Sequence, residues 1–340
     1  MSKLPAIGMR VHGGMAPRRC IDLAAGADKH GLASVWFAEN PFNRGVLPAV
    51  AGAVLATKRI KIGIGVFNPY NRHPTLIAME IGALDELAEG RAALSLGSGI
   101  GDRVTRMGLS YEKPLGAVRD AVTIVRGMMK GETVTHQGAV FSVSNVKMEY
   151  VPPRPQMPIY VAAMGDQALR LCGQIGDGVM ISNMCPPGYT ERALQVVQEG
   201  ANKAGRPRPK EVVQYVLCSV NADRGEARAA VRRTIAEMLP AYWAMGARWP
   251  AVREAMHGRS GIPEQEFVAA IDRLKAGDDP QQVLDDRFVD AYSISGTVDD
   301  CLKAAAGFGA VNVTELVVTF VGKAPLDEMA LLGPALRANA

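Results

Sequence analysis

A glycine-rich stretch, GIGVFNPYNRHP at residues 63–74, is where the sequence most clearly indicates chemistry. It begins as an apolar run with the pattern of a buried strand and breaks at Asn68-Pro69, because proline cannot donate a strand hydrogen bond and restricts the residue before it. Gly63 and Gly65 remove side chains near the end of this strand, which would let a flat ligand approach the backbone closely. The same residues could also do no more than terminate a strand, so the rest of the chain has to decide.

Two further glycine-rich segments point to the same kind of ligand. LGSGIGDR (96–103) only partly resembles a dinucleotide-binding fingerprint, because its glycines follow G-x-G-x-G and we expect no helix directly after it. In residues 158–183 an apolar run leads into Met164, Gly165 and Asp166 at the start of a predicted helix, whose free backbone N–H groups favour an anion. Asp166 could instead be an ordinary helix N-cap. Together the segments predict backbone surfaces for a planar ligand and a helix start that receives phosphate.

Other chemistries have little support in the sequence. There is no GxSxG or HExxH motif, and the predicted strand ends are poor in the paired carboxylates that a hydrolase would use. The five cysteines are scattered without a CxxC pair and the five histidines are equally dispersed, so we expect no metal site. Free thiols fit a reduced compartment, and we expect the protein to be cytoplasmic.

The composition is that of an ordinary globular protein. Of 340 residues, 48% are hydrophobic and 21% are charged, and the net charge is only +4. Because there is no block of lysine or arginine, neither nucleic acid nor a membrane surface is an expected partner. The N-terminal residues lack the pattern of a secretion signal, and no apolar stretch reaches the roughly 18 residues of a membrane span.

Short apolar runs alternate with amphipathic helical segments along most of the chain. This alternation predicts an α/β fold of the (β/α)8 TIM-barrel type, with a three-layer open sheet as the alternative. The eight expected strands are 7–11, 34–39, 61–67, 92–97, 158–163, 178–182, 212–220 and 315–321.

Two regions interrupt the alternation. Residues 132–151 have the two-residue periodicity of strands around Gln137-Gly138 and predict a β-hairpin inserted after the fourth helix. Residues 223–290 are charged and mostly helical, and they predict a helical insertion near the C-terminal mouth of the barrel, although they could also only cover its outside. Neither region has the composition of a linker, so we expect residues 1–340 to form a single domain.

Functional side chains of a TIM barrel collect at the C-terminal ends of its strands. Reading these ends gives Arg10, His12, Glu39, Asn40, 65–68, 98–102, 163–165 and Ser182. Arg10 could pair with a substrate carboxylate or phosphate, or could close the barrel by a salt bridge to Glu39. Arg44 and Asn68 are further candidates to line the mouth.

Five motifs, taken together and in order, resemble the bacterial luciferase-like superfamily of flavin and deazaflavin enzymes, and within it the methylenetetrahydromethanopterin reductase branch. The motifs are SVWFAENPFNR (34–44), GIGVFNPYNRHP (63–74), LSLGSGIGDR (94–103), the segment 158–183 and SISGTVDDC (293–301). The resemblance runs from about Ile7 to Leu332. It implies a (β/α)8 barrel with insertions and coenzyme F-420, or alternatively FMN, as the cofactor at the C-terminal mouth. It also implies a cis peptide bond at Gly65-Val66 against the central ring of that cofactor.

The resemblance and the strand ends together assign roles to individual residues. We expect Glu39, Arg10 and Asn40 to be catalytic. The expected cofactor-binding residues are Glu39, Gly65, Val66, Asn68, Ser98, Gly99, Ala163, Met164, Gly165, Gln167, Ala168 and Ser182. The stretch 163–168 is expected to lie near the phosphate of the cofactor.

The chain departs from this branch at positions that matter for the reaction. Glu39-Asn40 stands where related deazaflavin enzymes have Asp-His. Ile100 stands where they have an acid, and Arg10 stands where the tetrahydropterin reductases have Glu. Asp102 could replace the acid only if the loop geometry changed. Because a guanidinium cannot donate the proton of a carboxyl group, we expect neither methylenetetrahydromethanopterin reduction nor sugar-phosphate dehydrogenation.

Three functions remain open. The first is hydride transfer from reduced coenzyme F-420 to an unsaturated or carbonyl substrate, which the nearly full-length resemblance favours. The second is an FMN-dependent monooxygenase that acts on a small organic substrate with O2, which the missing acid at Ile100 favours. The third is a non-catalytic barrel that binds a cofactor or a pterin-like ligand, and only the lack of an identifiable acid–base pair supports it.

The helix predicted from residue 74 to 87, PTLIAMEIGALDEL, is apolar nearly all round. Such a helix must be buried on both sides. Met79, Ile81, Leu84 and Leu87 belong to this helix, which has more apolar surface than one face of a barrel needs, and it predicts a homodimer or a higher homo-oligomer. A small-molecule substrate is the other expected partner.

Overall fold

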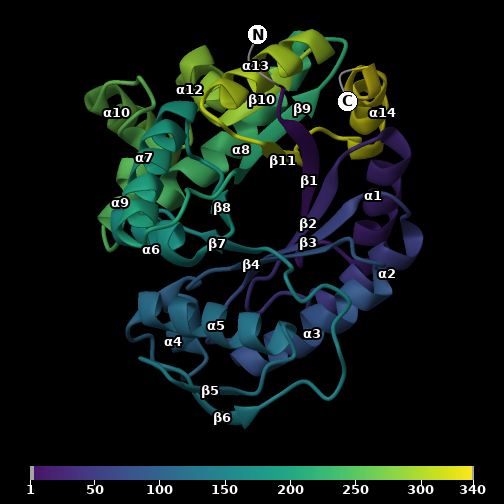
Figure 1. Ribbon diagram of the computed structural model, residues 1–340. Coiled ribbons are helices and arrows are strands. Elements are labelled where there is room, and N and C mark those ends of the chain that lie inside the picture. The colour runs from purple at the N-terminus through teal and green to yellow at the C-terminus, as the bar shows by residue number, and fades with distance from the viewer. Residues whose placement is uncertain (1–3, 339–340) are drawn as a thin grey trace.

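Eight parallel strands close into a barrel in the computed structural model, which describes residues 4–338 (Figure 1). They are β1 (Ala6–His12), β2 (Ser34–Ala38), β3 (Lys61–Phe67), β4 (Ala92–Leu96), β7 (Ile159–Ala162), β8 (Gly178–Ile181), β9 (Glu211–Val220) and β11 (Glu315–Phe320). Their order around the barrel is β9-β11-β1-β2-β3-β4-β7-β8, and β8 pairs with β9 to complete the ring. The predicted (β/α)8 barrel is confirmed, and the alternative of an open sheet is wrong.

A further parallel strand, β10 (Ser293–Gly296), was not anticipated as a strand from the sequence. It pairs with β9 from Leu217 to Val220, whereas β8 pairs with β9 over 211–214. The two strands therefore share one edge of β9, one beyond the other. Four residues are too few to show the two-residue alternation of a strand, so in the sequence this segment stands out only as part of a family motif.

Helices follow the strands and surround the barrel, with α1, α2 and α3 on one side and α6 and α7 on the other (Figure 1). Their bounds are α1 (Pro17–His30), α2 (Leu47–Ala56), α3 (Pro74–Leu87), α4 (Gly101–Arg106), α5 (Pro114–Met129), α6 (Asp166–Ile175), α7 (Pro187–Lys203), α8 (Arg224–Met245), α9 (Pro250–His257), α10 (Glu264–Lys275), α11 (Pro280–Val283), α12 (Asp286–Tyr292), α13 (Val298–Ala310) and α14 (Pro325–Ala338). Several begin with proline in the first turn, where its missing N–H costs nothing. Within residues 4–338, none of these helices is both long and apolar enough to cross a membrane.

The short helix α4 corrects the expectation that no helix follows the glycine-rich segment 96–103. It begins at Gly101, inside that segment, with Ile100 as its N-cap. Asp102 lies in its first turn and Arg106 in its last, which suits the helix dipole at both ends. A helix of six residues is too short to be read from periodicity.

The predicted hairpin is present as β5 (Val134–Gln137) and β6 (Ser142–Val146), which pair antiparallel at the bottom of Figure 1. Asp120 of α5 holds it in place. Its carboxylate accepts hydrogen bonds from the backbone N–H groups of Val140 at 2.8 Å and Phe141 at 3.0 Å, and lies 3.1 Å from His136 Nε2. The hairpin is therefore fastened to the outer helix layer, on the side of the molecule away from the helical insertion (Figure 1).

The second insertion consists of helices α8 to α12, which leave the barrel after β9 and return at β10. Its helices share an apolar cluster with the barrel residues Met184 and Leu217, in which Val231, Ile235, Leu239, Phe267 and Phe288 are fully or almost fully buried. The insertion therefore packs against the barrel near the ends of β8 and β9.

The interior of the barrel is filled by side chains that alternate along the strands. Trp36, Tyr160 and Tyr215 pack together there. At the N-terminal end, Glu315 accepts a hydrogen bond from Trp36 Nε1 at 2.9 Å and forms an ion pair with Lys61 at 2.6 Å. Because this buried network closes one end of the barrel, the space for a ligand lies at the opposite end.

Candidate active site

A cavity of about 450 Å³ lies at the C-terminal ends of the barrel strands, a size typical of small-molecule sites. All but one of the residues expected to be catalytic or to bind the cofactor line it, whereas the strand-end candidate His12 does not; the lining residues are Arg10, Glu39, Asn40, Gly65, Val66, Asn68, Ser98, Gly99, Ala163, Met164, Gly165, Ala168 and Ser182. Gln167 is the exception, because its side chain is exposed on α6. Arg44 does not line the cavity either, since its guanidinium donates to the carbonyl oxygens of Gly13 and Gly14.

The end of β3 forms one wall of the cavity through Gly65 and Val66, which are joined by a cis peptide bond as the resemblance implied. The glycines also have a packing role that the sequence did not show. A Cβ atom on Gly63 would lie 2.4 Å from the Trp36 ring, and one on Gly65 would lie 2.6 Å from the Tyr215 hydroxyl. The two glycines therefore make room for aromatic side chains inside the barrel, and Gly65 and Val66 both line the cavity.

Glu39, at the end of β2, is the only carboxylate among the described residues that line the cavity. Its Oε1 accepts a hydrogen bond from Arg72 Nη2 at 2.9 Å, so the alternative of an ion pair between Glu39 and Arg10 is wrong. Its Oε2 is buried and has no hydrogen-bond partner. A buried carboxylate oxygen without a donor is costly, so this atom is poised to accept a hydrogen bond from a ligand.

Helix α4 and the loop before it form a second wall. Arg103 donates a hydrogen bond of 2.5 Å to the side-chain oxygen of Asn40. Ile100 lines the cavity, whereas Asp102 points to Arg248 of the helical insertion, with 2.5 Å between the charged atoms. Asp102 therefore does not take the place of an acid at position 100. Gly99 has a φ of 72°, a left-handed conformation that favours glycine.

The third wall is the end of β7 and the start of α6. Gly165 is the N-cap of α6, and no side chain caps that helix. The expectation that Asp166 could be the N-cap is wrong, because its carboxylate forms two hydrogen bonds with Arg192, at 2.6 and 2.8 Å. These bonds hold the pKa of Asp166 below its ordinary value. The free N–H groups of the first turn remain available for an anion.

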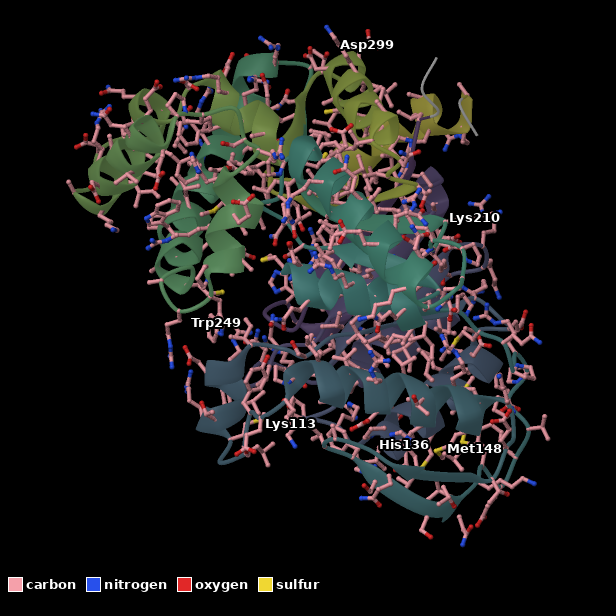
Figure 2. The ribbon with its side chains drawn as sticks, turned by 60° about the vertical axis from the view of Figure 1, so that its left-hand side comes forward. Lys113, His136, Met148, Lys210, Trp249 and Asp299 are labelled. Atoms are coloured by element: carbon pink, nitrogen blue, oxygen red, sulfur yellow. The ribbon has the colours of Figure 1, made fainter. Side chains whose placement is uncertain are left out.

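Several lining residues were not found from the sequence. Tyr215 comes from β9, and Tyr242, Met245 and Trp249 come from the helical insertion or the turn after α8. Figure 2 shows Trp249 at the edge of this insertion. This edge faces the region of Lys113, a residue in the segment between α4 and α5. No local pattern marks these residues, because they reach the cavity only through the packing of the insertion against the barrel.

Two tyrosine hydroxyl groups in the wall are hydrogen-bonded within the protein. Tyr215 donates a hydrogen bond of 2.9 Å to the carbonyl oxygen of Gly65, and Tyr242 donates one of 2.8 Å to the side-chain oxygen of Asn183. Burial raises the pKa of both tyrosines above the ordinary value, so both are neutral near pH 7. No cysteine or histidine lines the described cavity.

The composition of the wall limits the chemistry. It is mostly apolar, with two guanidinium groups, one carboxylate and a few hydroxyl and amide groups. Within residues 4–338, no cluster of three or more histidine, cysteine, aspartate or glutamate side chains is placed to hold a metal ion. Such a wall suits a flat organic ligand with polar edges, and it supplies orientation and charge rather than a nucleophile activated by a base.

Comparisons with known proteins agree with this geometry. The model of the luciferase-like monooxygenase family matches residues 3–314. The chain is 34% identical over 300 residues to the 5,10-methylenetetrahydromethanopterin reductase of Archaeoglobus fulgidus, with 86% of each protein covered. It is 31% identical over 230 residues to the F-420-dependent glucose-6-phosphate dehydrogenase of Microbacterium testaceum, which covers 64% of this chain and 68% of that protein.

A solved structure shows the same fold. The coenzyme F-420-dependent tetrahydromethanopterin reductase of Methanopyrus kandleri superposes with a TM-score of 0.83, at 24% sequence identity, over 97% of both chains.

Proposed function

The chain belongs to the luciferase-like monooxygenase family, and we propose that it is an oxidoreductase that uses reduced coenzyme F-420 to deliver a hydride to a small unsaturated or carbonyl substrate. The observation that carries this proposal is Glu39 Oε2, a buried carboxylate oxygen without a partner in an otherwise apolar and backbone-lined cavity. The N–H at the pyrimidine edge of a deazaflavin ring would satisfy it. FMN offers a similar edge, so the choice of F-420 rests on the F-420-dependent relative and on the reductase relative.

The residues around the cavity fit such a cofactor. Gly97 brings bare backbone to the wall, where a Cβ atom would lie 3.3 Å from Ala162 and 3.4 Å from Val66. Val66 and Met164 would contact the ring, and the uncapped start of α6 would receive the phosphate. When bound in its reduced form, the cofactor supplies a hydride, that is, two electrons with one proton.

The chain's own groups would orient the reactants. Arg72 fixes the orientation of Glu39 through its 2.9 Å hydrogen bond, and Arg103 fixes Asn40. The proton that accompanies the hydride has no carboxyl donor at positions 10 or 100, where arginine and isoleucine stand. We propose that this proton comes from water or from a substrate already protonated.

The competing function is an FMN-dependent monooxygenase, and the apolar side chain of Ile100 in the cavity wall favours it. Activation of oxygen does not need a protein acid at that position. It does need FMN rather than F-420, so the two functions predict different cofactors and different use of oxygen.

The proposal is tested by binding and by oxygen use. Purified protein is titrated with oxidised F-420 and with FMN, and then mixed anaerobically and aerobically with each reduced cofactor while oxygen is recorded. We expect F-420 to bind and no oxygen to be consumed. Binding of FMN with oxygen consumption would establish the monooxygenase instead, and binding of neither would favour the non-catalytic barrel.

Glu39→Gln tests directly whether the unpartnered carboxylate oxygen of Glu39 binds the cofactor. Because a hydrogen bond to a charged acceptor contributes roughly 1.5–3 kcal/mol, we expect the affinity for F-420 to fall at least about tenfold. Glu86→Gln, which changes an exposed carboxylate of α3 outside the cavity, is the matched control and should leave the affinity unchanged.

We also propose that the barrel and its insertions work as one functional unit. The barrel alone does not complete the cavity, because Tyr242, Met245 and Trp249 of the helical insertion and the turn after α8 form part of its wall.

All five cysteines are free and buried, which supports the proposed cytoplasmic location.

A homodimer is the oligomeric state that we propose. Ile81 and Leu84 of α3 are buried within the subunit, but the exposed fractions of Leu76, Met79 and Leu87 are 47%, 50% and 44%. Leu55 of the neighbouring helix α2 is 69% exposed. An apolar surface of this kind on two adjacent helices supports self-association through α2 and α3.

A further inference from the structure

Arg10 is a half-buried arginine whose positive charge the proposed reaction does not use. Its side chain lines the cavity from β1, and its Nε is buried without a hydrogen-bond partner. Among residues 4–338, no carboxylate forms an ion pair with it. Its guanidinium carbon lies 5.2 Å from the centroid of the Tyr215 ring, over which it stacks. A guanidinium that is partly withdrawn from water is stabilised by an anionic partner, and in this protein that place is open to a ligand.

The cavity as a whole carries an excess of positive charge. Its charged lining residues are Arg10, Arg103 and Glu39. Glu39 is already paired with Arg72, which lies outside the lining, and Arg103 bonds to the neutral amide of Asn40. Neither guanidinium in the wall therefore meets a carboxylate there, and the cavity is set to receive an anion.

Arg10 is distant from the place proposed for the phosphate of the cofactor. In the closed order β1-β2-β3-β4-β7, strand β1 stands across the barrel from β7 and from the start of α6. Tyr242 of α8 lines the same cavity as Arg10 and Arg103, and its hydroxyl is held by the hydrogen bond to Asn183.

We propose that Arg10 binds a carboxylate of the substrate, and that the substrate is a small carboxylic acid with an apolar body. The planar guanidinium matches the planar carboxylate, and the free Nε gives it a donor for one of the two oxygens. Met180, Met245 and Trp249 in the same wall provide the apolar surface for the rest of the molecule. That this anion is the substrate of an F-420-dependent reaction rests on the proposed function, whereas the anion site itself does not.

The test uses benzoate and its neutral counterpart benzamide, titrated calorimetrically into the whole protein with and without saturating oxidised F-420. Arg10→Gln removes the charge, and Arg10→Lys keeps the charge but loses the planar pair of N–H donors of the guanidinium group. Arg106→Gln is the matched control, because Arg106 is an exposed arginine of α4 that stacks on Phe42 outside the cavity. We expect benzoate to bind more tightly than benzamide. Its dissociation constant should rise at least about tenfold in Arg10→Gln, less in Arg10→Lys and not at all in Arg106→Gln.

Several results would overturn the inference. One is an unchanged affinity for benzoate in Arg10→Gln, and another is failure of benzoate to bind better than benzamide to the unmodified protein. Tighter binding of inorganic phosphate than of benzoate would assign the site to a phosphate. A loss of F-420 affinity in Arg10→Gln, with benzoate unaffected, would assign Arg10 to the cofactor.

Two controls keep the result decisive. If circular dichroism shows that Arg10→Gln does not fold, the inference is tested instead by benzoate binding to Arg10→Lys and by the salt dependence of binding to the unmodified protein. Benzoate affinity should then fall with ionic strength while benzamide affinity stays constant, and equal behaviour would contradict the inference. If F-420 does not bind but benzoate depends on Arg10, the proposed function fails and the anion site stands.

Discussion

The hydroxyl group of Tyr215 donates a hydrogen bond of 2.9 Å to the carbonyl oxygen of Gly65, linking β9 to the end of β3 across the interior of the barrel. This one contact fixes the position of the backbone that forms the cavity wall next to Val66. It also places the Tyr215 ring beneath the guanidinium of Arg10. The Tyr215 side chain therefore contacts both the wall proposed to bind the cofactor and the guanidinium of Arg10 proposed to bind the substrate.

Tyr215→Phe should weaken cofactor binding without unfolding the protein. It keeps the ring but removes a hydrogen bond that contributes about 1 kcal/mol, so we expect the affinity for oxidised F-420 to fall by roughly fivefold in a fluorescence titration. Tyr70→Phe is the control, since it also removes a hydroxyl donor, to the carbonyl oxygen of Glu112, but lies outside the cavity. An equal loss of affinity in both variants would contradict the role given to Tyr215.

Gly65→Ala should destabilise the barrel and abolish tight cofactor binding. The added Cβ would lie 2.6 Å from the Tyr215 hydroxyl and 2.9 Å from both Met180 and Trp36. Overpacking of this kind costs about 1–3 kcal/mol, so the midpoint of thermal unfolding should fall by several degrees. Gly45→Ala has nothing within 4 Å of the new Cβ and should change neither stability nor binding.

His12 should report the charge of Arg10 in solution. Burial, and secondly the positive charge of Arg10, lower the pKa of His12 from its ordinary value of 6.5. Arg10→Gln should therefore raise this pKa, although burial should still keep it below 6.5. Histidine ring protons followed by NMR against pH measure the change, with the His12 signal identified by its loss in His12→Gln. An unchanged pKa would show that the two side chains do not interact.

The same shift has a consequence for stability. Because the pKa of His12 is lower in the folded than in the unfolded protein, the unfolded state binds the proton first as the pH falls below 6.5. The contribution of His12 to stability is present above that pH and is lost as the pH falls through the folded-state pKa. Between pH 7.5 and pH 5.5, the midpoint of thermal unfolding of the unmodified protein should therefore fall further than that of His12→Gln.

Restoring an acid at position 100 should not create a methylenetetrahydromethanopterin reductase. Ile100 is the N-cap of α4 and shares the cavity with Arg10. A carboxyl group there would be held ionised, because a nearby cation typically lowers a carboxyl pKa by about 1–3 units. We expect Ile100→Asp and Ile100→Glu to be inactive with reduced F-420 and methylenetetrahydromethanopterin, whereas Arg10→Glu combined with either should show a trace. Robust turnover by the unmodified protein would prove the mapping of the missing acids wrong.

Met79→Glu should convert the proposed dimer into a monomer. The substitution puts a charge in the middle of the exposed apolar surface of α3, where desolvating it in an interface is costly. Light scattering at micromolar concentration should give the dimer mass for the unmodified protein and half of it for the variant. Leu331→Glu on α14, an equally exposed apolar position, should leave the mass unchanged. A monomer in the unmodified protein would refute the proposal.

The sequence by itself determined the architecture and the location of the site. Strand and helix periods are local properties, and their regular alternation leaves a closed parallel barrel as the economical way to bury every strand. The C-terminal ends of parallel strands meet at one end of a barrel. Arg10, Glu39, Gly65 and Ser98 therefore had to come together there, although 88 positions separate the first from the last.

Only the tertiary structure decided which of these groups interact. Glu39 pairs with Arg72 rather than with Arg10, Asp102 turns outward to Arg248, and Gly65 is small because Tyr215 fills the barrel beside it. Each of these outcomes depends on side chains far apart in the chain, whose distances are set by the packing of the barrel and its helical insertion. A local pattern carries no information on such distances, and so the unpaired charge of Arg10 became visible only in the folded protein.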